Sequence, residues 1–264
     1  MSPNNSLVES IIQAASRAGS FQLDSVKKLQ KSDVESKGLN DFVSFVDKQS
    51  EEMLLNDLSM IIPGSAFLAE ESGEKATGSE WTWIVDPLDG TTNYIHGIPL
   101  YSVSIGLMRN GELYAGVVHE PNLNEIFHAV KGEGAFLNRQ PIRVTNTAAM
   151  KDSLWATGFP YHDFEKIDQY MDFIRYSIRH THGLRRLGSA AVDLVYTAAG
   201  RMDGFFEFGL NPWDVAAGAL IVQEAGGVVT DFSGSDGYVF NKEIIACNPV
   251  LFKEFFEKFR GIYF

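Results

Sequence analysis

The chain of 264 residues is poor in cysteine, in excess positive charge and in long apolar runs. Its single cysteine, Cys247, excludes an intrachain disulfide framework and a cysteine-rich zinc site. A formal net charge of -12 leaves no cluster of Lys and Arg to replace the counterions of a nucleic acid, so we expect no nucleic-acid partner. Because we find neither a secretory signal nor an apolar stretch long enough to cross a bilayer, we expect a cytoplasmic protein without a membrane partner.

The remaining composition is that of a globular protein, with 45% hydrophobic residues available for a core. Apolar residues at helical spacing predict a helix over 7–18 and a second one over 44–62, where Pro63 ends it. The polar stretch 27–40 between them indicates a mobile connection that could act as a lid. Two helices are therefore expected before the first strand.

The middle of the chain predicts strands, and the last part mixes strands with helices. The expected strands and helices after the second helix are strands over 65–69, 81–85, 101–108, 112–119, 125–130, 154–158, 205–208, 228–230 and 244–246, and helices over 164–178, 189–199, from 211 and from 250. We expect an α+β domain with an antiparallel sheet over 1–144 and an α/β domain over 145–264. Alternating layers of helices and sheets would bury all the apolar faces.

The segment 81–93, with the sequence WTWIVDPLDGTTN, carries the most chemistry. An apolar run delivers Asp86 and Asp89, three residues apart, into a turn. We expect Pro87 to end the strand and Gly90 to let the backbone approach a ligand. Carboxylate oxygens held in this way are what Mg²⁺ requires, and such a cation can also neutralise a phosphate. An acidic chain can bind phosphate only through such ions.

Two further carboxylates occupy comparable positions. Glu70 follows the apolar residues 66–69, and Asp214 lies in the first turn of an expected helix, where the helix dipole favours an anion. Taken singly, each has an ordinary explanation as a turn residue or a helix cap. Together they favour a metal site. Thr91, where a short helix would begin, offers free amides to a phosphate.

These residues resemble the three signatures of the inositol monophosphatase family. The matching segments are Asp86 to Asn93, Ala69 to Ser72 and Trp213 to Gly218, and the resemblance covers about residues 41–227. It implies a layered α-β-α-β-α sandwich of the α+β or α/β class, also found in fructose-1,6-bisphosphatases. It also implies hydrolysis of a phosphate monoester by water, without a phosphoenzyme.

The resemblance implies a role for individual residues. The implied ligands of two or three Mg²⁺ ions are Glu70, Asp86, the carbonyl of Leu88, Asp89 and Asp214. Asp47, which otherwise reads as an exposed helix charge, would act with Thr91 to orient and deprotonate the attacking water. The groups implied to contact the substrate are the amides of Gly90 and Thr91 for the phosphate, and Gly188, Ser189, Ala190, Glu207 and Asp214 for the rest of the molecule. Lys37 lies closer to Asp41 than the family pattern places its lysine, and we leave it out of the site.

The resemblance also implies a substrate. Thr92, where phosphatases of 3'-phosphoadenosine 5'-phosphate usually have lysine, favours myo-inositol monophosphate, the expected small phosphorylated polyol. Two alternative substrates remain, 3'-phosphoadenosine 5'-phosphate and fructose 1,6-bisphosphate. Arg185 and Arg186 could bind the second phosphate group of either, although we favour the interpretation that both are ordinary surface charges. A non-catalytic sugar-phosphate-binding module is a further alternative. Lithium inhibition and a homodimer are implied as well, with Phe159 or Tyr161 at the dimer interface.

Overall fold

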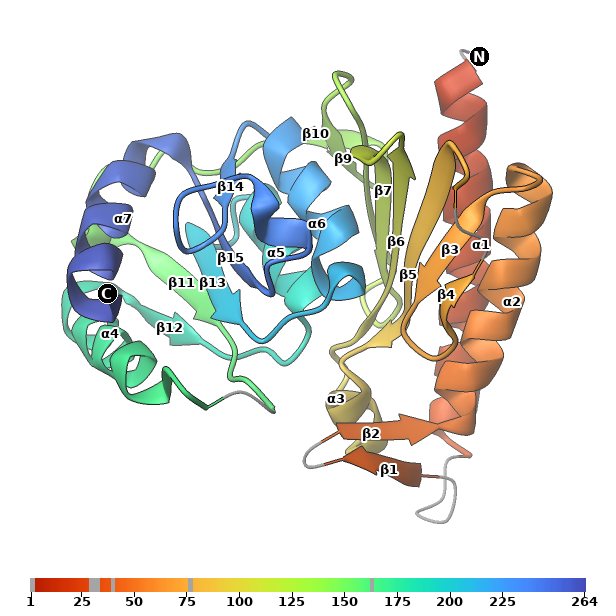
Figure 1. The fold of residues 1–264 in the computed structure, drawn as a ribbon, viewed down its shortest axis with the longest axis horizontal. Coiled ribbons are helices and arrows are strands. Elements are labelled where there is room, and N and C mark those ends of the chain that lie inside the picture. Colours follow the sequence, from red (N-terminus) through yellow and green to blue (C-terminus); the bar gives the residue numbers. More distant parts are fainter. Residues whose placement is uncertain (1–2, 29–33, 39–40, 76–77, 162–163) are drawn as a thin grey trace.

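The chain folds into five alternating layers of helices and sheets, which Figure 1 shows edge-on. The computed structural model describes residues 3–28, 34–38, 41–75, 78–161 and 164–264. Two sheets are separated by a pair of helices, and each sheet is covered by another helix pair on its other face. The expected α-β-α-β-α sandwich is confirmed.

The larger sheet has eight strands among the described residues. Their spatial order is β10 (Gln140–Ile142), β9 (Ala135–Leu137), β8 (Glu125–Val130), β7 (Glu112–Glu120), β6 (Ser102–Arg109), β5 (Trp81–Asp89), β3 (Ala66–Ala69) and β4 (Gly73–Lys75). Strands β6, β7 and β8 form the predicted antiparallel meander, which β5 extends on one side and β9 and β10 on the other, whereas β3 lies parallel to β5. This parallel pair matters for the site, because both strands end at the same edge.

The smaller sheet has five strands in the part of the chain that the structure describes. Their spatial order is β12 (Gly183–Arg185), β11 (Leu154–Thr157), β13 (Gly204–Phe208), β15 (Glu243–Cys247) and β14 (Val228–Thr230). β11 is parallel to both of its neighbours, and β15 is antiparallel to both of its own. Cys247 lies buried here, as expected of a small apolar residue.

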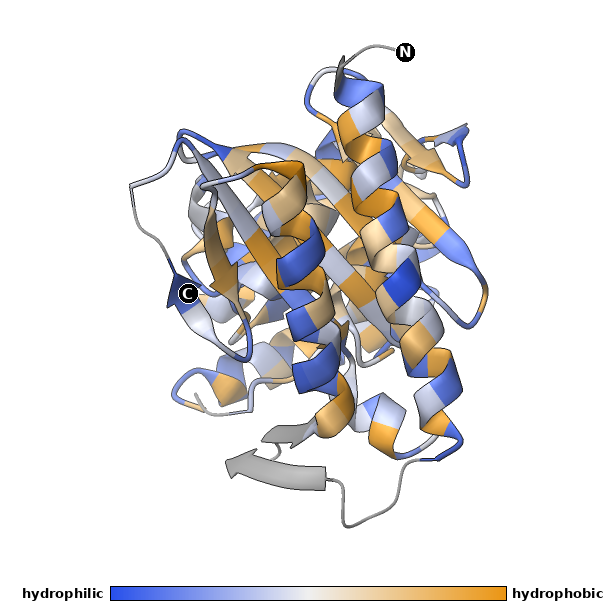
Figure 2. Ribbon diagram, turned by 90° about the vertical axis from the view of Figure 1, so that its right-hand side faces the viewer, coloured by the Kyte–Doolittle hydropathy of each residue, from blue (hydrophilic) through white to orange (hydrophobic). Residues whose placement is uncertain are grey.

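The helices form the three remaining layers. Their bounds are α1 (Pro3–Val26) and α2 (Phe45–Ile61) outside the larger sheet, α5 (Ala190–Ala198) and α6 (Pro212–Glu224) between the sheets, and α4 (Ile167–His180) and α7 (Pro249–Tyr263) outside the smaller sheet. Figure 2 looks onto α1 and α2, where hydrophilic and hydrophobic residues alternate along each helix, as expected for helices with one face in water. By contrast, all residues of α5 except Tyr196 are buried, because it lies between two sheets. No helix within the described ranges is both long and apolar enough to span a membrane.

Several local predictions need correction. β5 does not end at Pro87 but continues to Asp89, because a bulge between Asp86 and Asp89 takes the proline out of the regular ladder. The expected connection 27–40 contains β1 (Val34–Gly38), which pairs with β2 (Asp41–Ser44), so a hairpin precedes α2. Residues 29–33 and 39–40, and the side chain of Lys37, lie outside the described residues. The short strands β4, β9, β10 and β12 were not predicted, because three-residue strands carry too little periodicity.

Candidate active site

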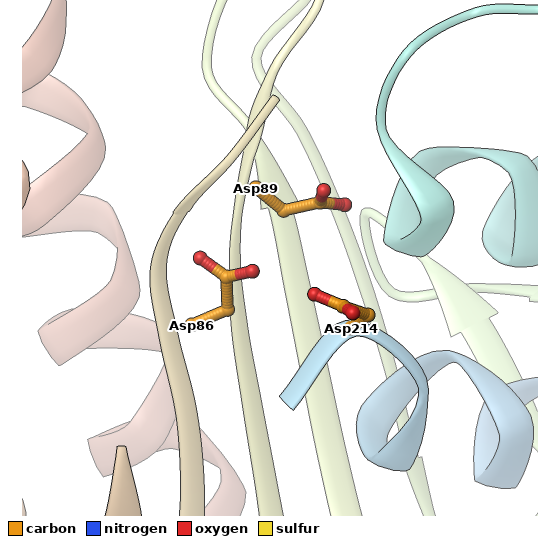
Figure 3. A group of neighbouring side chains, drawn as sticks. All are labelled: Asp86, Asp89 and Asp214. Atoms are coloured by element: carbon orange, nitrogen blue, oxygen red, sulfur yellow. The ribbon is translucent and has the colours of Figure 1, made fainter. Parts of the chain in front are cut away.

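Four carboxylates meet at the edge of the larger sheet. Ala69 pairs with Val85 in the parallel ladder of β3 and β5, so the next residues, Glu70 and Asp86, follow adjacent strand ends. Asp89 ends β5, and Asp214 comes from the first turn of α6. The carboxylate oxygens of Asp86, Asp89 and Asp214 lie within 4.8 Å of one another, and Figure 3 shows their carboxylates around one shared space. Residues 125 positions apart in the chain therefore form one cluster.

The charges of this cluster oppose one another. Burial, followed by the charges of Glu70, Asp89 and Asp214, raises the pKa of Asp86 well above its usual value. Burial, followed by the charge of Asp89, likewise raises the pKa of Asp214, and burial raises that of Asp89 to about 6. Buried carboxylates are stable as ions only beside a compensating cation. A set of oxygen donors alone fits a hard cation such as Mg²⁺.

Neighbouring donors orient each carboxylate through one of its oxygens. Asp89 Oδ2 accepts hydrogen bonds from Ser189 Oγ at 2.6 Å and from the Ala191 amide at 2.7 Å, at the start of α5. Asp214 Oδ2 accepts from the Asn211 amide at 2.6 Å as part of a capping box. The Leu88 amide donates to Asp86 Oδ1 at 2.9 Å. The start of α5 is thus tied to the end of β5, and the three aspartates Asp86, Asp89 and Asp214 are each restrained by at least one hydrogen bond.

Thr91 and Asp47 form a hydrogen-bonded pair behind the cluster. Thr91 Oγ1 lies 2.9 Å from Asp47 Oδ1 and 3.0 Å from the carbonyl oxygen of Leu88, both of which can accept its proton. The other oxygen of Asp47 accepts from the amide and hydroxyl of Ser44, in the capping box of α2. Asp47 is fully buried, not an exposed helix charge, and this burial raises its pKa against the lowering effect of the hydrogen bonds from Ser44 and Thr91.

Gly90 allows the chain to turn between β5 and α3 (Thr91–Ile95). Its φ of +97° is in the region that favours glycine, and a Cβ there would lie 3.1 Å from the carbonyl oxygen of Gly188. Asn93 Nδ2 reinforces the contact, because it is 2.8 Å from the carbonyl oxygens of both Leu100 and Leu187. The turn after β5 and the loop before α5 are therefore packed together at one position.

A cavity of about 250 Å³ extends from the carboxylates towards the smaller sheet. At the end of β13, Glu207 is 8% exposed, and burial raises its pKa to about 8. Its carboxyl group lies 2.0 Å from where a Cβ of Gly158 would be, so any larger residue at position 158 would displace Glu207. Arg186 Nη2 donates to the Tyr161 hydroxyl at 3.0 Å at the cavity wall.

The structure brings together most of the residues singled out from the sequence. The predicted residues that line the cavity are Glu70, Asp86, Leu88, Asp89, Gly90, Thr91, Gly188, Ser189, Ala190, Glu207 and Asp214. Asp47 stands behind Thr91 and does not line it. Arg185 and Arg186 are both exposed, in agreement with the surface-charge interpretation, but Arg186 also lines the cavity, whereas Arg185 bonds the carbonyl oxygen of Leu184.

Some lining residues were missed or placed elsewhere. Phe159 and Tyr161 line the cavity and are also exposed, so their contact with a second subunit stays a prediction. Asp193 was not considered, although it is the one charged residue in the apolar segment Ala190–Ala198, and that isolation was a usable signal. Thr157, which follows from no motif, also lines the cavity.

A layered α/β fold with buried carboxylates beside a cavity defines a class of protein that can hold metal ions next to a small ligand. The model of the Inositol monophosphatase family matches residues 4–262. The chain therefore belongs to the inositol monophosphatase family, a family of phosphatases that are typically metal-dependent.

Individual relatives agree with this assignment. A protein named putative Nus factor SuhB, from Neisseria meningitidis serogroup B, is 44% identical over 93% of this chain and 94% of its own length. An inositol-1-monophosphatase from Mesorhizobium japonicum is 41% identical over 94% of this chain and 93% of its own. The crystal structure of the extragenic suppressor protein suhB from Bartonella henselae superposes with a TM-score of 0.91, at 40% identity over 97% of this chain and 98% of that one.

Proposed function

We propose that this protein hydrolyses a small phosphorylated polyol by attack of water on phosphorus, and that myo-inositol monophosphate is the first candidate substrate. The observation that carries the proposal is the position of the Thr91–Asp47 pair directly behind a cluster of buried carboxylates, at one end of a cavity. The 41% identity to a relative named inositol-1-monophosphatase supports the choice of ester.

The carboxylate cluster would hold the metal. The residues that would bind two or three Mg²⁺ ions are Glu70, Asp86, Asp89, Asp214 and, through its carbonyl, Leu88. When bound, Mg²⁺ lowers the pKa of water and neutralises the negative charge of a phosphate dianion. Without that compensation, a chain with a net charge of -12 would repel its substrate.

The protein's own groups would position water and substrate. Because the Thr91 hydroxyl donates to Asp47, its oxygen is free to accept a hydrogen bond from water and to orient it. Asp47 would take up the proton that the water loses, and burial makes its carboxylate a stronger base than an exposed aspartate. The amides of Gly90 and Thr91 would bind phosphate oxygens. The groups that would contact the alcohol part are Gly188, Ser189, Ala190, Glu207 and Asp214.

Two other functions have some support. Arg186 lines the cavity and could contact a second phosphate group, which favours fructose 1,6-bisphosphate or 3'-phosphoadenosine 5'-phosphate. The Neisseria relative is named a putative Nus factor, and a binding protein without turnover is the other alternative. The Thr91–Asp47 pair argues against the latter, because binding alone does not require a proton acceptor behind the carboxylates.

One assay separates these possibilities. We expect phosphate release from inositol 1-phosphate with Mg²⁺ to exceed release from either bisphosphate by at least 10-fold, and to stop when a chelator is added. Higher activity on a bisphosphate would reassign the substrate, and no release from any ester would support the binding protein. As a control, the variant Asp168→Asn, in the exposed first turn of α4, should behave like the wild type.

We also propose a homodimer in the cytoplasm and inhibition by lithium. The family resemblance supports all three. Lithium would be tested in the same assay, where inhibition at millimolar concentration is expected. Sedimentation of the purified protein would test the dimer, and a monomer at all concentrations would contradict it.

A further inference from the structure

Asp193, at the wall of the cavity, has a buried carboxyl oxygen that no group of the described residues hydrogen-bonds. It lies in the first turns of α5, is 1% exposed and lines the same cavity as the carboxylate cluster. Its Oδ1 atom is buried and accepts no hydrogen bond from the described residues. A buried acceptor in this state costs about 1–3 kcal/mol of folding free energy. Nothing in the local fold accounts for that cost, because α5 is already capped by Ser189, whose hydroxyl accepts from the Val192 amide.

The groups around Asp193 include both acceptors and donors. Glu207 and Asp89 are close enough to raise the pKa of Asp193 further, after burial, and Arg186 lowers it. Arg186 also bonds the hydroxyl of Tyr161. This side of the cavity therefore offers carboxyl oxygens, a guanidinium group and a phenol.

This combination suits a neutral ligand better than a metal ion. Asp193 is not part of the one group in the described chain whose ligand atoms come together within 4.8 Å, Asp86, Asp89 and Asp214. An arginine near Asp193 would also repel a cation. A hydroxyl group, in contrast, can donate to a carboxyl group and accept from a guanidinium at the same time.

We propose that Asp193 is a specificity-determining residue that accepts a hydrogen bond from a hydroxyl group on the alcohol part of the substrate. The inference rests on the proposed phosphatase function and narrows its substrate class to esters of polyhydroxylated alcohols. Asp193 and Glu207 then form a hydroxyl-binding wall next to the carboxylate cluster that faces the phosphate. An ester without free hydroxyl groups leaves Asp193 without a partner and gains nothing from it.

The test compares two esters on three proteins. Asp193→Leu keeps the branching at Cγ but replaces the two oxygens by larger methyl groups that accept no hydrogen bond, and Asp193→Asn has nearly the same volume as aspartate and keeps one acceptor. Phosphate release with Mg²⁺ is measured from inositol 1-phosphate and from phenyl phosphate, whose alcohol part has no free hydroxyl. We expect Asp193→Leu to raise KM for inositol 1-phosphate about 2- to 10-fold, the value of a hydrogen bond between uncharged groups, with phenyl phosphate hydrolysis unchanged. The KM of Asp193→Asn for inositol 1-phosphate should lie between those of Asp193→Leu and the wild type.

A second measurement excludes a purely structural role. Replacing the buried carboxyl group by the neutral amide of Asp193→Asn, which has nearly the same volume, should leave Tm unchanged or raise it, whereas a structural role predicts a lower Tm and equal losses on both esters. Equal losses, no loss on either ester, or a changed Mg²⁺ requirement with an unchanged KM would each overturn the inference alone. If the wild type hydrolysed neither ester, the proposed function would fail first and the inference with it.

Discussion

The two sides of the cavity use the same functional group in opposite ways. On the side of the larger sheet, Asp86, Asp89 and Asp214 bring their oxygens within 4.8 Å of one another, so their charges oppose one another. On the side of the smaller sheet, Glu207 and Asp193 are buried near the guanidinium of Arg186. The two sets therefore differ in the ligand they suit. The three aspartates on the first side need a cation, whereas Glu207 and Asp193 on the second side can bind neutral hydroxyl groups. Geometry, and not residue type, separates the two roles.

The contrast arises from how the chain holds each group. Asp89 and Asp214 are fixed by backbone amides at the starts of α5 and α6, so their free oxygens cannot turn away from the shared space. For Glu207 the structure shows no such hydrogen bond among the described residues, and its position depends on the space left by Gly158. Hydrogen bonds can hold the carboxylates of Asp89 and Asp214 together against their electrostatic repulsion. Packing alone, as for Glu207, gives no such restraint.

The largest effect is expected from Asp89→Asn. The amide oxygen of asparagine can still accept from Ser189 and Ala191, so the fold should persist while one charge leaves the cluster. Loss of several kcal/mol of electrostatic stabilisation should lower kcat by about 10³-fold or more. The check is phosphate release with Mg²⁺ beside a thermal unfolding curve, with Asp168→Asn as the matched control. Near-normal turnover would show that Asp89 does not serve the metal.

A smaller but still large effect is expected from Thr91→Val. Valine keeps the shape and the backbone amide but removes the hydroxyl that lies 2.9 Å from Asp47 Oδ1. Losing the proton relay should reduce kcat about 10²- to 10⁴-fold, with KM little changed. Thr91→Ser is the control, because it retains the hydroxyl and should stay within 10-fold of the wild type. If valine and serine had equal effects, the hydroxyl would have no part in proton transfer.

The sequence predicted one side of the cavity better than the other. Asp86 and Asp89 lie three residues apart after an apolar strand, and Glu70 and Asp214 each have a local context, so neighbouring residues were sufficient for the cluster. Asp193 and Arg186 acquire their surroundings only when the start of α5 and the residues after β12 come to line the same cavity as the end of β5, and no local pattern encodes that arrangement. Glu207 was assigned through the family resemblance alone.

Predictions of the fold failed for a similar reason. Long periodic segments such as α2, β7 and β8 were predicted within a residue or two. Pro87 was expected to end β5, because a proline removes one backbone donor from a ladder. The bulge between Asp86 and Asp89 absorbs that loss, and it also lets both carboxylates reach the cluster from one strand. Local rules describe the cost of a proline but not the tertiary arrangement that accommodates it.

The smallest effect concerns stability on the side of the smaller sheet. Burial raises the pKa of Glu207 from 4.5 to about 8, so between these values the folded protein holds a proton that the unfolded chain releases. The free energy of unfolding should therefore fall as pH rises from about 4.5 through 8, because the folded state must then bury a charge. Glu207→Gln stays neutral, so its free energy of unfolding should not show the decrease caused by ionisation of Glu207. For each kcal/mol of that decrease, Tm of the variant at pH 9 should be about 2–4 °C higher than Tm of the wild type. Thermal unfolding between pH 5 and 9 would measure this difference in Tm between Glu207→Gln and the wild type. Glu257→Gln, on the exposed face of α7, is the control. Parallel curves for the wild type and Glu207→Gln would mean that Glu207 is accommodated as an ion, and the contrast between the two sides of the cavity would disappear.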